Sequence, residues 1–331
     1  MDNDFISMSD NAEKPERKFP KPGPVAAIVV MIIELFIFMF VMAPAQYYWG
    51  MWGLVVTELS LVVMSLVAAW VVGLDIKEML RIKKIKVNEF FGTIVIWTAS
   101  LLFLMIANLT FFYFFPDGLT VNESINEFTS QWPIVPTLFV VGIMPAICEE
   151  MLHRGFIQRC MMRKFKSRML ISILMGIFFG IFHMDFYRFL GTAILGGVLS
   201  YILVVTDNFF YNMLFHFVNN FSVQLLAYFT SKMPDSDMGA VAEMMTGEVI
   251  AVGLASYLII GCLAPMIMFG GILLLKGKKK IADEGKTKFF IELAISIGLS
   301  IAMAGAGFIL MIVFAMNGYL DAAATMGALF G

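Results

Sequence analysis

The sequence has 331 residues, of which 60% are hydrophobic and only 15% are charged. A soluble globular domain is nearer ~45–50% apolar and ~25% charged. This composition excludes an ordinary soluble domain and predicts a polytopic membrane protein that contacts the lipid bilayer. The formal net charge of −2 gives no sign of a nucleic-acid or acidic partner, because such partners need a basic surface.

Residues 1–22 form a polar stretch that carries both charge signs and contains Pro15, Pro20 and Pro22. It has no short apolar segment that ends in a small-residue cleavage site, so it does not fit a signal peptide. Because it holds too little apolar surface to fold alone, we expect a disordered cytoplasmic tail.

Nine apolar stretches follow, each near the ~20 residues that a helix needs to cross an ~30 Å hydrocarbon core. They are Val25–Ala43, Trp52–Val72, Thr93–Phe115, Ile134–Glu150, Met169–His183, Phe189–Val205, Phe209–Phe229, Val249–Leu275 and Phe289–Phe314. The expected fold class is all-α, a polytopic transmembrane helix bundle of about eight or nine spans. The fifth, sixth and seventh stretches are short or close together, so we expect them to tilt or break.

Basic residues divide unevenly between the two sides of this map. With the N-terminus in the cytoplasm, 21 of the 23 lysines and arginines fall in cytoplasmic segments, and only Arg188 and Lys232 fall outside. The positive-inside rule is therefore satisfied, and we expect a multi-pass protein of a bacterial plasma membrane. The basic segment Asp75–Phe91 has two open interpretations, an interfacial amphipathic helix or a plain loop.

Seven chemically informative residues interrupt three of the central apolar stretches. They are Glu149, Glu150 and Arg154, then Phe179 and His183, then His216 and Asn220. Charged side chains at bilayer depth cost several kcal/mol, so they indicate a functional site. Each set contains an i,i+4 pair, whose members share one helix face. Glu150 can pair with Arg154, while Glu149, ~100° further round the helix, is free to point elsewhere.

The three sets can meet at one depth in the membrane. Glu149 and His183 lie 17 residues either side of Lys166, so a helical hairpin that reverses there places them at equal height. At ~1.5 Å per residue, the chain then brings His216 within roughly 6 Å of that level, about one helical turn. This convergence requires the helix of Glu149 to continue through Gly155–Phe165. We expect the site to open toward the cytoplasmic half of the bilayer.

Such a cluster is suited to hydrolysis. Glu149 could take a proton from a water that His183 helps to position, while His216 and Asn220 donate hydrogen bonds to the developing oxyanion. Alternatively, Glu149, His183 and His216 could hold a Zn²⁺ ion that activates the water, as in a metalloprotease. Both versions lead to cleavage of a peptide bond within the membrane, and no other cofactor is indicated.

The motifs Glu-Glu-x-x-x-Arg, Phe-x-x-x-His and His-x-x-x-Asn, in this order on successive helices, resemble those of the CPBP family of intramembrane proteases. That family includes the CAAX prenyl endopeptidases, the abortive-infection (ABI) proteins, and bacteriocin-processing or self-immunity proteins. The resemblance runs from about Pro133 to Phe221. The roles it implies are water activation by Glu149 with His183, oxyanion stabilisation by His216 with Asn220, and support of the site by Glu150, Arg154 and Phe179.

With this resemblance the chain divides into four parts. After the tail come N-terminal transmembrane helices with the basic amphipathic segment (23–132), a CPBP-like catalytic core (133–230) and C-terminal transmembrane helices (231–331). The substrate that we expect is a membrane-associated peptide or protein.

Other interpretations stay open. The motifs could belong to a non-catalytic or weakly active bacteriocin self-immunity or scaffold protein that binds a membrane peptide. A proton-coupled transporter is a further alternative, but it would need polar residues along a path and an internal repeat. Glu34 and Glu58 could be structural partners inside the bundle, and His153 could be an interfacial filler.

Overall fold

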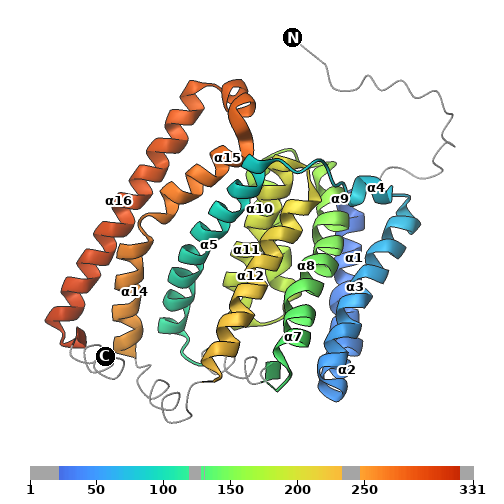
Figure 1. Ribbon diagram of the computed structural model, residues 1–331, viewed down its shortest axis with the longest axis horizontal. Helices are drawn as coiled ribbons and strands as arrows, with labels where there is room; N and C mark the ends of the chain where they lie inside the picture. Colours follow the sequence, from blue (N-terminus) through green and yellow to red (C-terminus); the bar gives the residue numbers. More distant parts are fainter. Residues whose placement is uncertain (1–21, 119–127, 130, 233–246, 321–331) are drawn as a thin grey trace.

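The computed structural model describes residues 22–118, 128–129, 131–232 and 247–320 (Figure 1). All regular structure in these ranges is helical, which confirms the all-α prediction. Residues 1–21, which make up nearly all of the expected tail, lie outside the described residues.

The N-terminal half consists of helices that run up and down beside one another. In order they are α1 (Pro24–Ile37), η1 (Phe38–Met42), α2 (Ala43–Trp49), α3 (Met51–Val72), α4 (Ile76–Met79) and α5 (Val87–Phe114). The next helix is continuous from Ile134 to Met162. Its parts are α7 (Ile134–Thr137), η2 (Leu138–Ile143), α8 (Met144–Glu150), η3 (Met151–Ile157) and α9 (Gln158–Met162).

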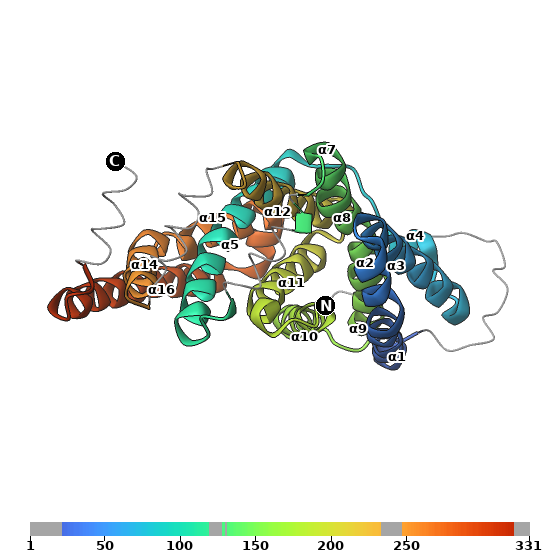
Figure 2. The same ribbon diagram turned by 90° about the horizontal axis from the view of Figure 1, so that it is seen from below.

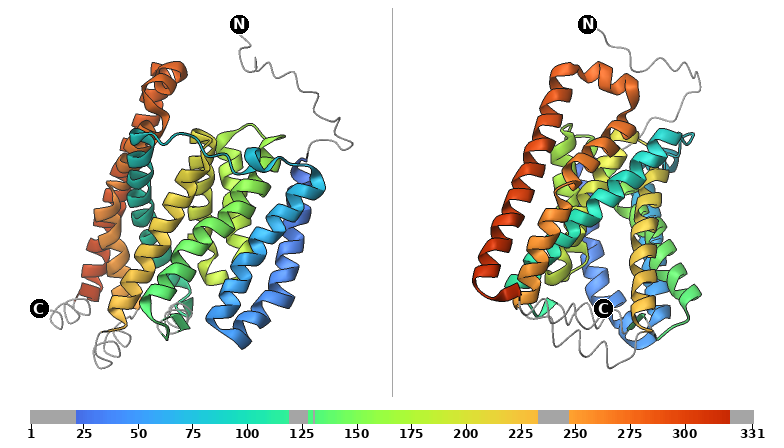
Figure 3. Two further views of the ribbon diagram at one scale, coloured as in Figure 1. Left: turned by 45° about the vertical axis from the view of Figure 1, so that its right-hand side comes forward. Right: turned by 60° about the vertical axis from the view of Figure 1, so that its left-hand side comes forward.

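The remaining helices complete the bundle. They are α10 (Arg168–Phe182), α11 (Phe186–Thr206), α12 (Phe209–Thr230), α14 (Gly247–Gly261), α15 (Ala264–Glu284) and α16 (Lys286–Met316). In Figure 2, α8, α11 and α12 lie in the middle, with α1–α3 on one side and α14–α16 on the other. The turn between α15 and α16 projects beyond the other helices (Figure 3).

The nine predicted stretches all coincide with helices, but the number of spans stays a prediction. By length and apolar composition, six of the described helices can cross a membrane, or seven if the bent pair α14 and α15 counts as one span. This pair is bent by 44°. The stretch Val249–Leu275 is therefore two helices. The fifth, sixth and seventh stretches, which were expected to tilt or break, are the unbroken helices α10, α11 and α12.

Two of the three wide, π-helical turns have a proline just behind them. Pro44 follows η1, and Pro145 follows η2. Proline has no N–H to give to the carbonyl four residues earlier, and its ring clashes with that carbonyl. A wider turn relieves the clash, and such bulges are frequent at functional sites. In η2, the N–H of Met144 bonds to the carbonyl of Phe139 instead.

Glycines bring α10 and α11 into close contact, as small residues do in membrane helix pairs. A Cβ added to Gly176 would lie 2.5 Å from the carbonyl oxygen of Ala193, and one added to Gly196 would lie 2.6 Å from the Cβ of Phe179. The absence of a side chain at Gly196 therefore lets α11 pack directly against Phe179.

The segment Asp75–Phe91 is mostly a loop. Only α4, one helical turn, precedes the start of α5, so the interfacial-helix interpretation is wrong. Asp207, at the turn between α11 and α12, anchors this loop. Its carboxylate pairs with Arg81 at 2.8 Å, with Lys83 at 2.7 Å and with Arg159 of α9 at 2.6 Å. These ion pairs join the α4–α5 loop, α9 and the α11–α12 turn at the basic end of the bundle.

Candidate functional site

A cavity of about 650 Å³ lies between the N-terminal helices and the central ones. Its walls come from η1, α2 and α3 on one side and from η2, α8, α10, α11 and α12 on the other. All four residues expected to be catalytic, Glu149, His183, His216 and Asn220, line this cavity. The convergence predicted from chain spacing is therefore present, and the helix of Glu149 continues through Gly155 as it required.

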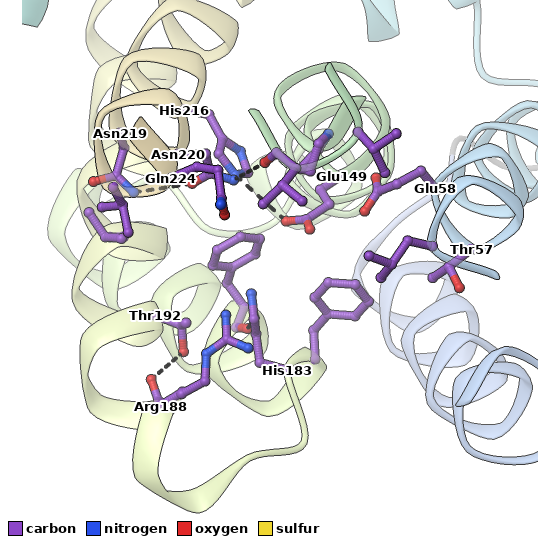
Figure 4. Close-up of a pocket in the computed structure, with 18 of the residues that line it drawn as sticks. Thr57, Glu58, Glu149, His183, Arg188, Thr192, His216, Asn219, Asn220 and Gln224 are labelled. Carbon is purple, nitrogen blue, oxygen red and sulfur yellow. Dashed lines mark hydrogen bonds and ion pairs between the residues drawn. The ribbon is translucent and has the colours of Figure 1, made fainter. Parts of the chain in front are cut away.

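The two adjacent glutamates point in different directions. Glu149 faces the cavity (Figure 4), and its Oε2 lies 3.8 Å from Nε2 of His216, too far for a hydrogen bond. Glu150 is fully buried and pairs with Arg154, Oε1 to Nη1, at 3.0 Å. Neighbours in sequence thus have separate surroundings, because one step along a helix turns the side chain by ~100°.

Arg154 holds three helices together from a fully buried position. Besides Glu150, it donates a hydrogen bond from Nη2 to the carbonyl oxygen of Gly196 on α11, at 3.2 Å. Its guanidinium also lies over the ring of Phe179 on α10, 4.2 Å from the centroid. Such stacking suits the planar guanidinium better than a lysine ammonium, so arginine fits this position specifically.

Phe179 separates two histidines. Its ring centroid is 4.8 Å from that of His183 and 6.0 Å from that of His216. His183 follows α10 directly, and its Nδ1–H donates to the carbonyl oxygen of Phe179 at 2.8 Å. Because this bond occupies Nδ1, the Nε2 of a neutral His183 is an acceptor on the cavity wall.

The chain turns sharply after His183. Met184 has a left-handed backbone, with φ of 46°, which is unusual for a non-glycine residue. Asp185 then caps α11, its carboxylate accepting from the N–H groups of Tyr187 at 2.8 Å and Arg188 at 3.3 Å. The capped turn fixes where His183 sits relative to α11.

His216 connects the two glutamates. Its Nδ1–H donates to Oε1 of Glu150 at 2.8 Å, so its Nε2 is the atom that faces Glu149. Arg154, Glu150, His216 and Glu149 form a buried row of alternating charge when His216 is protonated. Their charges sum to zero in that state, which limits the cost of burying them.

Asn220 is held by the irregular turn on the facing helix. Its Nδ2 donates to the carbonyl oxygen of Val141 at 3.2 Å, and its Oδ1 accepts from Nδ2 of Asn219 at 3.1 Å. Val141 lies four residues before Pro145, so its carbonyl lacks the N–H that a regular helix would supply. The proline therefore creates the acceptor that positions Asn220.

Sequence reasoning gave little weight to several residues of this cavity. Glu58 of α3 and Arg188 of α11 both line it, together with Thr192, Asn219 and Gln224 (Figure 4). For Glu58 the available signal was a charged residue inside an apolar stretch, and for a membrane helix this signal does not say which face is buried.

His153 is buried, not interfacial. Its Nδ1–H donates to the backbone carbonyl of Glu149 at 2.9 Å, and its Nε2 lies 3.5 Å from Oε1 of Glu34 on α1. Its ring also packs against Phe179 and Phe182. Neither His153 nor Glu34 is among the residues that line the cavity. Their contact therefore joins η3 to α1 on a side of the helix that does not face the cavity.

The metal alternative can be tested against the side-chain positions. Within the part of the chain that the structure describes, no three His, Cys, Asp or Glu side chains are grouped so that they could hold a metal ion. The expected set, Glu149, His183 and His216, shares the cavity but does not form such a group. The arrangement therefore does not fit a resident zinc ion held by these three residues.

The cavity lies in the half of the bundle away from the basic loops. It is lined by Gln46 near the end of α2, by Thr129 before α7, by Asp185 between α10 and α11, and by Gln224 in the second half of α12. These positions are at the opposite end of the helices from α4 and the turn between α9 and α10 (Figure 1). This differs from the expectation of an opening toward the basic, cytoplasmic half.

The fold and the cavity define a polytopic membrane protein with a buried cluster of acidic, basic and amide side chains. Residues 130–222 match the family model described as Type II CAAX prenyl endopeptidase Rce1-like. The match confirms the resemblance drawn from the motifs, and this segment is similar to the CAAX-type intramembrane proteases of the CPBP family. It covers less than a third of the chain but includes all seven motif residues. Comparison with curated proteins and with solved structures gave no match.

Proposed function

We propose that this protein is an intramembrane endopeptidase that hydrolyses a peptide bond of a membrane-associated peptide or protein by means of Glu149. The observation that carries the proposal is the position of its carboxylate. Glu149 is almost completely buried, faces a cavity large enough for a peptide segment, and has an imidazole nearby on the same wall. A family match over the same helices supports proteolysis as the reaction class.

In this proposal, Glu149 removes a proton from a water in the cavity, and His183 orients that water through its acceptor Nε2. The hydroxide attacks the carbonyl carbon of the scissile bond. The oxyanion that develops accepts hydrogen bonds from Nε2–H of protonated His216 and from the second amide hydrogen of Asn220. Such donors act strongly where water is excluded. Glu150 and Arg154 keep His216 oriented.

The family match is compatible with both a glutamate-dependent and a metal-dependent mechanism of hydrolysis. We favour the glutamate mechanism because Glu149, His183 and His216 are not grouped so that they could hold one metal ion. The hydrogen bonds at Nδ1 of His216 and of His183 are compatible with either mechanism, since a metal-bound histidine also donates its second N–H.

The test is cleavage of fluorogenic transmembrane peptides by the purified protein in liposomes. We expect Glu149→Gln to lower kcat by about 10²–10⁴-fold, the range of general-base catalysis, and His216→Ala by about 10²–10³-fold, the range of an oxyanion donor. The control is Glu89→Gln, which changes a buried glutamate outside the cavity. Full activity in Glu149→Gln would overturn the assignment.

Two further outcomes decide between the alternatives. Activity that survives a chelator supports the glutamate mechanism, and activity that is lost and then restored by Zn²⁺ supports the metallo-endopeptidase. If the wild-type protein binds the peptides but cleaves none of them, the immunity or scaffold alternative is correct.

We also infer that substrates enter from the extracytoplasmic half. The cavity lies away from the basic loops, and the positive-inside rule puts those loops in the cytoplasm. Val223 lines the cavity and is 56% exposed, so a Val223→Cys variant in a Cys262→Ser background should react in intact cells with a membrane-impermeant maleimide. Lys166→Cys, at the basic end, is the matched control and should react only after lysis. The reverse pattern would refute this inference.

A further inference from the structure

Glu58 is a buried acid inside the cavity that belongs to none of the three motifs. It lies on α3, outside the segment that matches the protease family. Its side chain is almost completely buried and lines the cavity. Its Oε2 has no hydrogen-bond partner among the described residues, although buried polar atoms normally have one. Such an atom indicates a ligand, a water or a proton that the protein side chains do not supply.

The carboxyl of Glu58 points toward that of Glu149 across the cavity (Figure 4). The two groups interact electrostatically, and Oε2 of Glu149 is likewise buried without a hydrogen-bond partner among the described residues. Two carboxylates that face one another away from bulk water cannot both carry a full negative charge at low cost. One proton is then held between them, and the pair titrates as a unit.

The surroundings of Glu58 favour its protonated form. The helices packed against α3 carry these ionisable side chains: Glu34 from α1, Tyr47 and Tyr48 from α2, Cys148, Glu149 and Glu150 from α8, and His153 and Arg154 from η3. Arg188 lies elsewhere on the cavity wall. Nη1 of Arg154 forms an ion pair with Oε1 of Glu150 at 3.0 Å, and Nε2 of His153 lies 3.5 Å from Oε1 of Glu34. No cation on these helices is left to stabilise a Glu58 carboxylate.

We propose that Glu58 is a second catalytic carboxylate, which shares one proton with Glu149 and delivers it to the leaving amine. This inference rests on the proposed endopeptidase function and adds the general acid that it lacks. An amide nitrogen is a poor leaving group until it gains a proton, so a proton donor on the cavity wall lowers the barrier of bond cleavage.

The proton balance closes over one turnover. At the start, Glu149 is a carboxylate and Glu58 is a carboxylic acid. Glu149 takes a proton from water as the hydroxide adds to the carbonyl carbon. The C–N bond then breaks with its electron pair on nitrogen, and Glu58 gives its proton to that nitrogen. The products are a carboxylic acid and an amine. The proton on Glu149 passes to Glu58, which restores the starting state without an external reagent.

The test uses the fluorogenic peptide that the wild-type protein cleaves fastest, together with the same peptide carrying an ester in place of the scissile amide. An alkoxide needs less help to leave than an amine anion. We expect Glu58→Gln to lower kcat on the amide by about 100-fold or more, within the range of general-acid catalysis, and on the ester by less than about tenfold, with KM unchanged. Glu58→Asp should recover part of the loss. Glu89→Gln is the control.

The pH profile is a second readout that a structural role would not change. A general acid must be protonated, so the wild-type kcat should fall on the alkaline side as the shared proton is lost. Glu58→Gln should lower the whole profile and change the shape of its alkaline limb, since only the proton of His216 then remains to be lost there. Equal losses on amide and ester, or an unchanged alkaline limb in a folded Glu58→Gln protein, would overturn the proposal.

Failure of the endopeptidase function can be told apart from failure of this inference. The infrared carbonyl band of a protonated carboxylic acid reports the shared proton without turnover. If the pair exists, this band disappears in Glu58→Gln and shifts in Glu149→Gln, even in a protein that cleaves nothing. If the band is unchanged in Glu58→Gln, no proton resides on Glu58 and the inference fails, whatever the activity.

Discussion

The side-chain amide of Asn220 donates to the carbonyl oxygen of Val141 at 3.2 Å, and so α12 is joined to the wide turn η2 of the facing helix. The acceptor is free because Pro145, four residues later, has no N–H. Pro145 thus leaves a backbone acceptor at Val141, and this acceptor positions Asn220, a candidate catalytic side chain.

This relationship can be tested by a double-mutant cycle. We expect Asn220→Ala to lower the free energy of unfolding by ~1 kcal/mol, a common value for an interhelical hydrogen bond in a membrane protein. In a Pro145→Ala background, the new N–H can bond to Val141 itself, so the same substitution should have a smaller effect. Thermal unfolding in detergent measures both. Strictly additive effects would show that Pro145 and Asn220 are independent.

Arg154 should be far more sensitive to substitution than an arginine at the surface. Arg154→Lys keeps the charge but loses the stacking on Phe179 and one of the contacts to Glu150 and Gly196. Disrupting a buried ion pair costs about 3–5 kcal/mol, and we expect the loss of stability to approach that range. Arg168→Lys, whose pair with Glu284 is half exposed, should cost less than about 1 kcal/mol. Equal losses would contradict the anchoring role.

Gly196 is tightly packed and Gly298 is not, so alanine substitutions at these two glycines can be compared directly. Gly196→Ala would bring a Cβ to 2.6 Å from Cβ of Phe179, whereas Gly298→Ala on α16 meets nothing within 4 Å. We expect Gly196→Ala to reduce both stability and activity, since it displaces Phe179 from between Arg154 and the histidines. Gly298→Ala should be neutral or stabilising by less than ~1 kcal/mol. Circular-dichroism melting and peptide cleavage distinguish the two.

Asp207 makes the basic end of the bundle sensitive to acid. Burial alone would raise its pKa, but hydrogen bonds from Lys83, Arg159 and Arg81 outweigh burial and hold the pKa at about 2, below the usual 3.8. A lowered pKa stabilises the fold above the unfolded value, and this stabilisation is lost as the pH falls from about 4 to about 2.

The measurement compares the wild-type protein with Asp207→Asn at several pH values. The wild type should unfold at a higher temperature, with a constant difference from pH 7 to pH 5 that shrinks below about pH 4 as Asp207 becomes protonated. Asp75→Asn, which removes an exposed carboxylate at the start of α4 but keeps the acceptor that caps the helix, should show no comparable trend. A difference that grows on acidification would contradict the ion-pair cluster.

The meeting of Glu149, His183 and His216 followed from chain spacing, because helices fix the rise per residue. Chain spacing did not correctly predict which half of the bundle contains the cavity. The apolar stretch was ended at Glu150, which put Glu149 at the inner end of its helix, but the helix extends over 29 residues to Met162. Glu149 is therefore near the middle of its helix, and the cavity reaches outward from there to His183.

Glu58 was harder to predict for a different reason. In a soluble protein, an acid on the apolar face of a helix stands out because the other face is polar. A membrane helix is apolar all round, so the sequence of α3 does not reveal which side faces protein and which faces lipid. The π-helical turns were also not predicted, since proline marks where a helix is perturbed but not how it adapts.

The wall of the cavity that carries Glu58 comes from residues 38–58, whereas the family motifs lie within residues 130–222. The motif helices alone would leave the cavity open to lipid on that side. The motif residues and this wall are thus encoded in separate stretches of the chain. Exchanging α1–α3 between proteins that share these motifs and also carry an acid at the position of Glu58 should transfer the choice of peptide without moving a motif residue, which makes α1–α3 the natural place to redesign specificity.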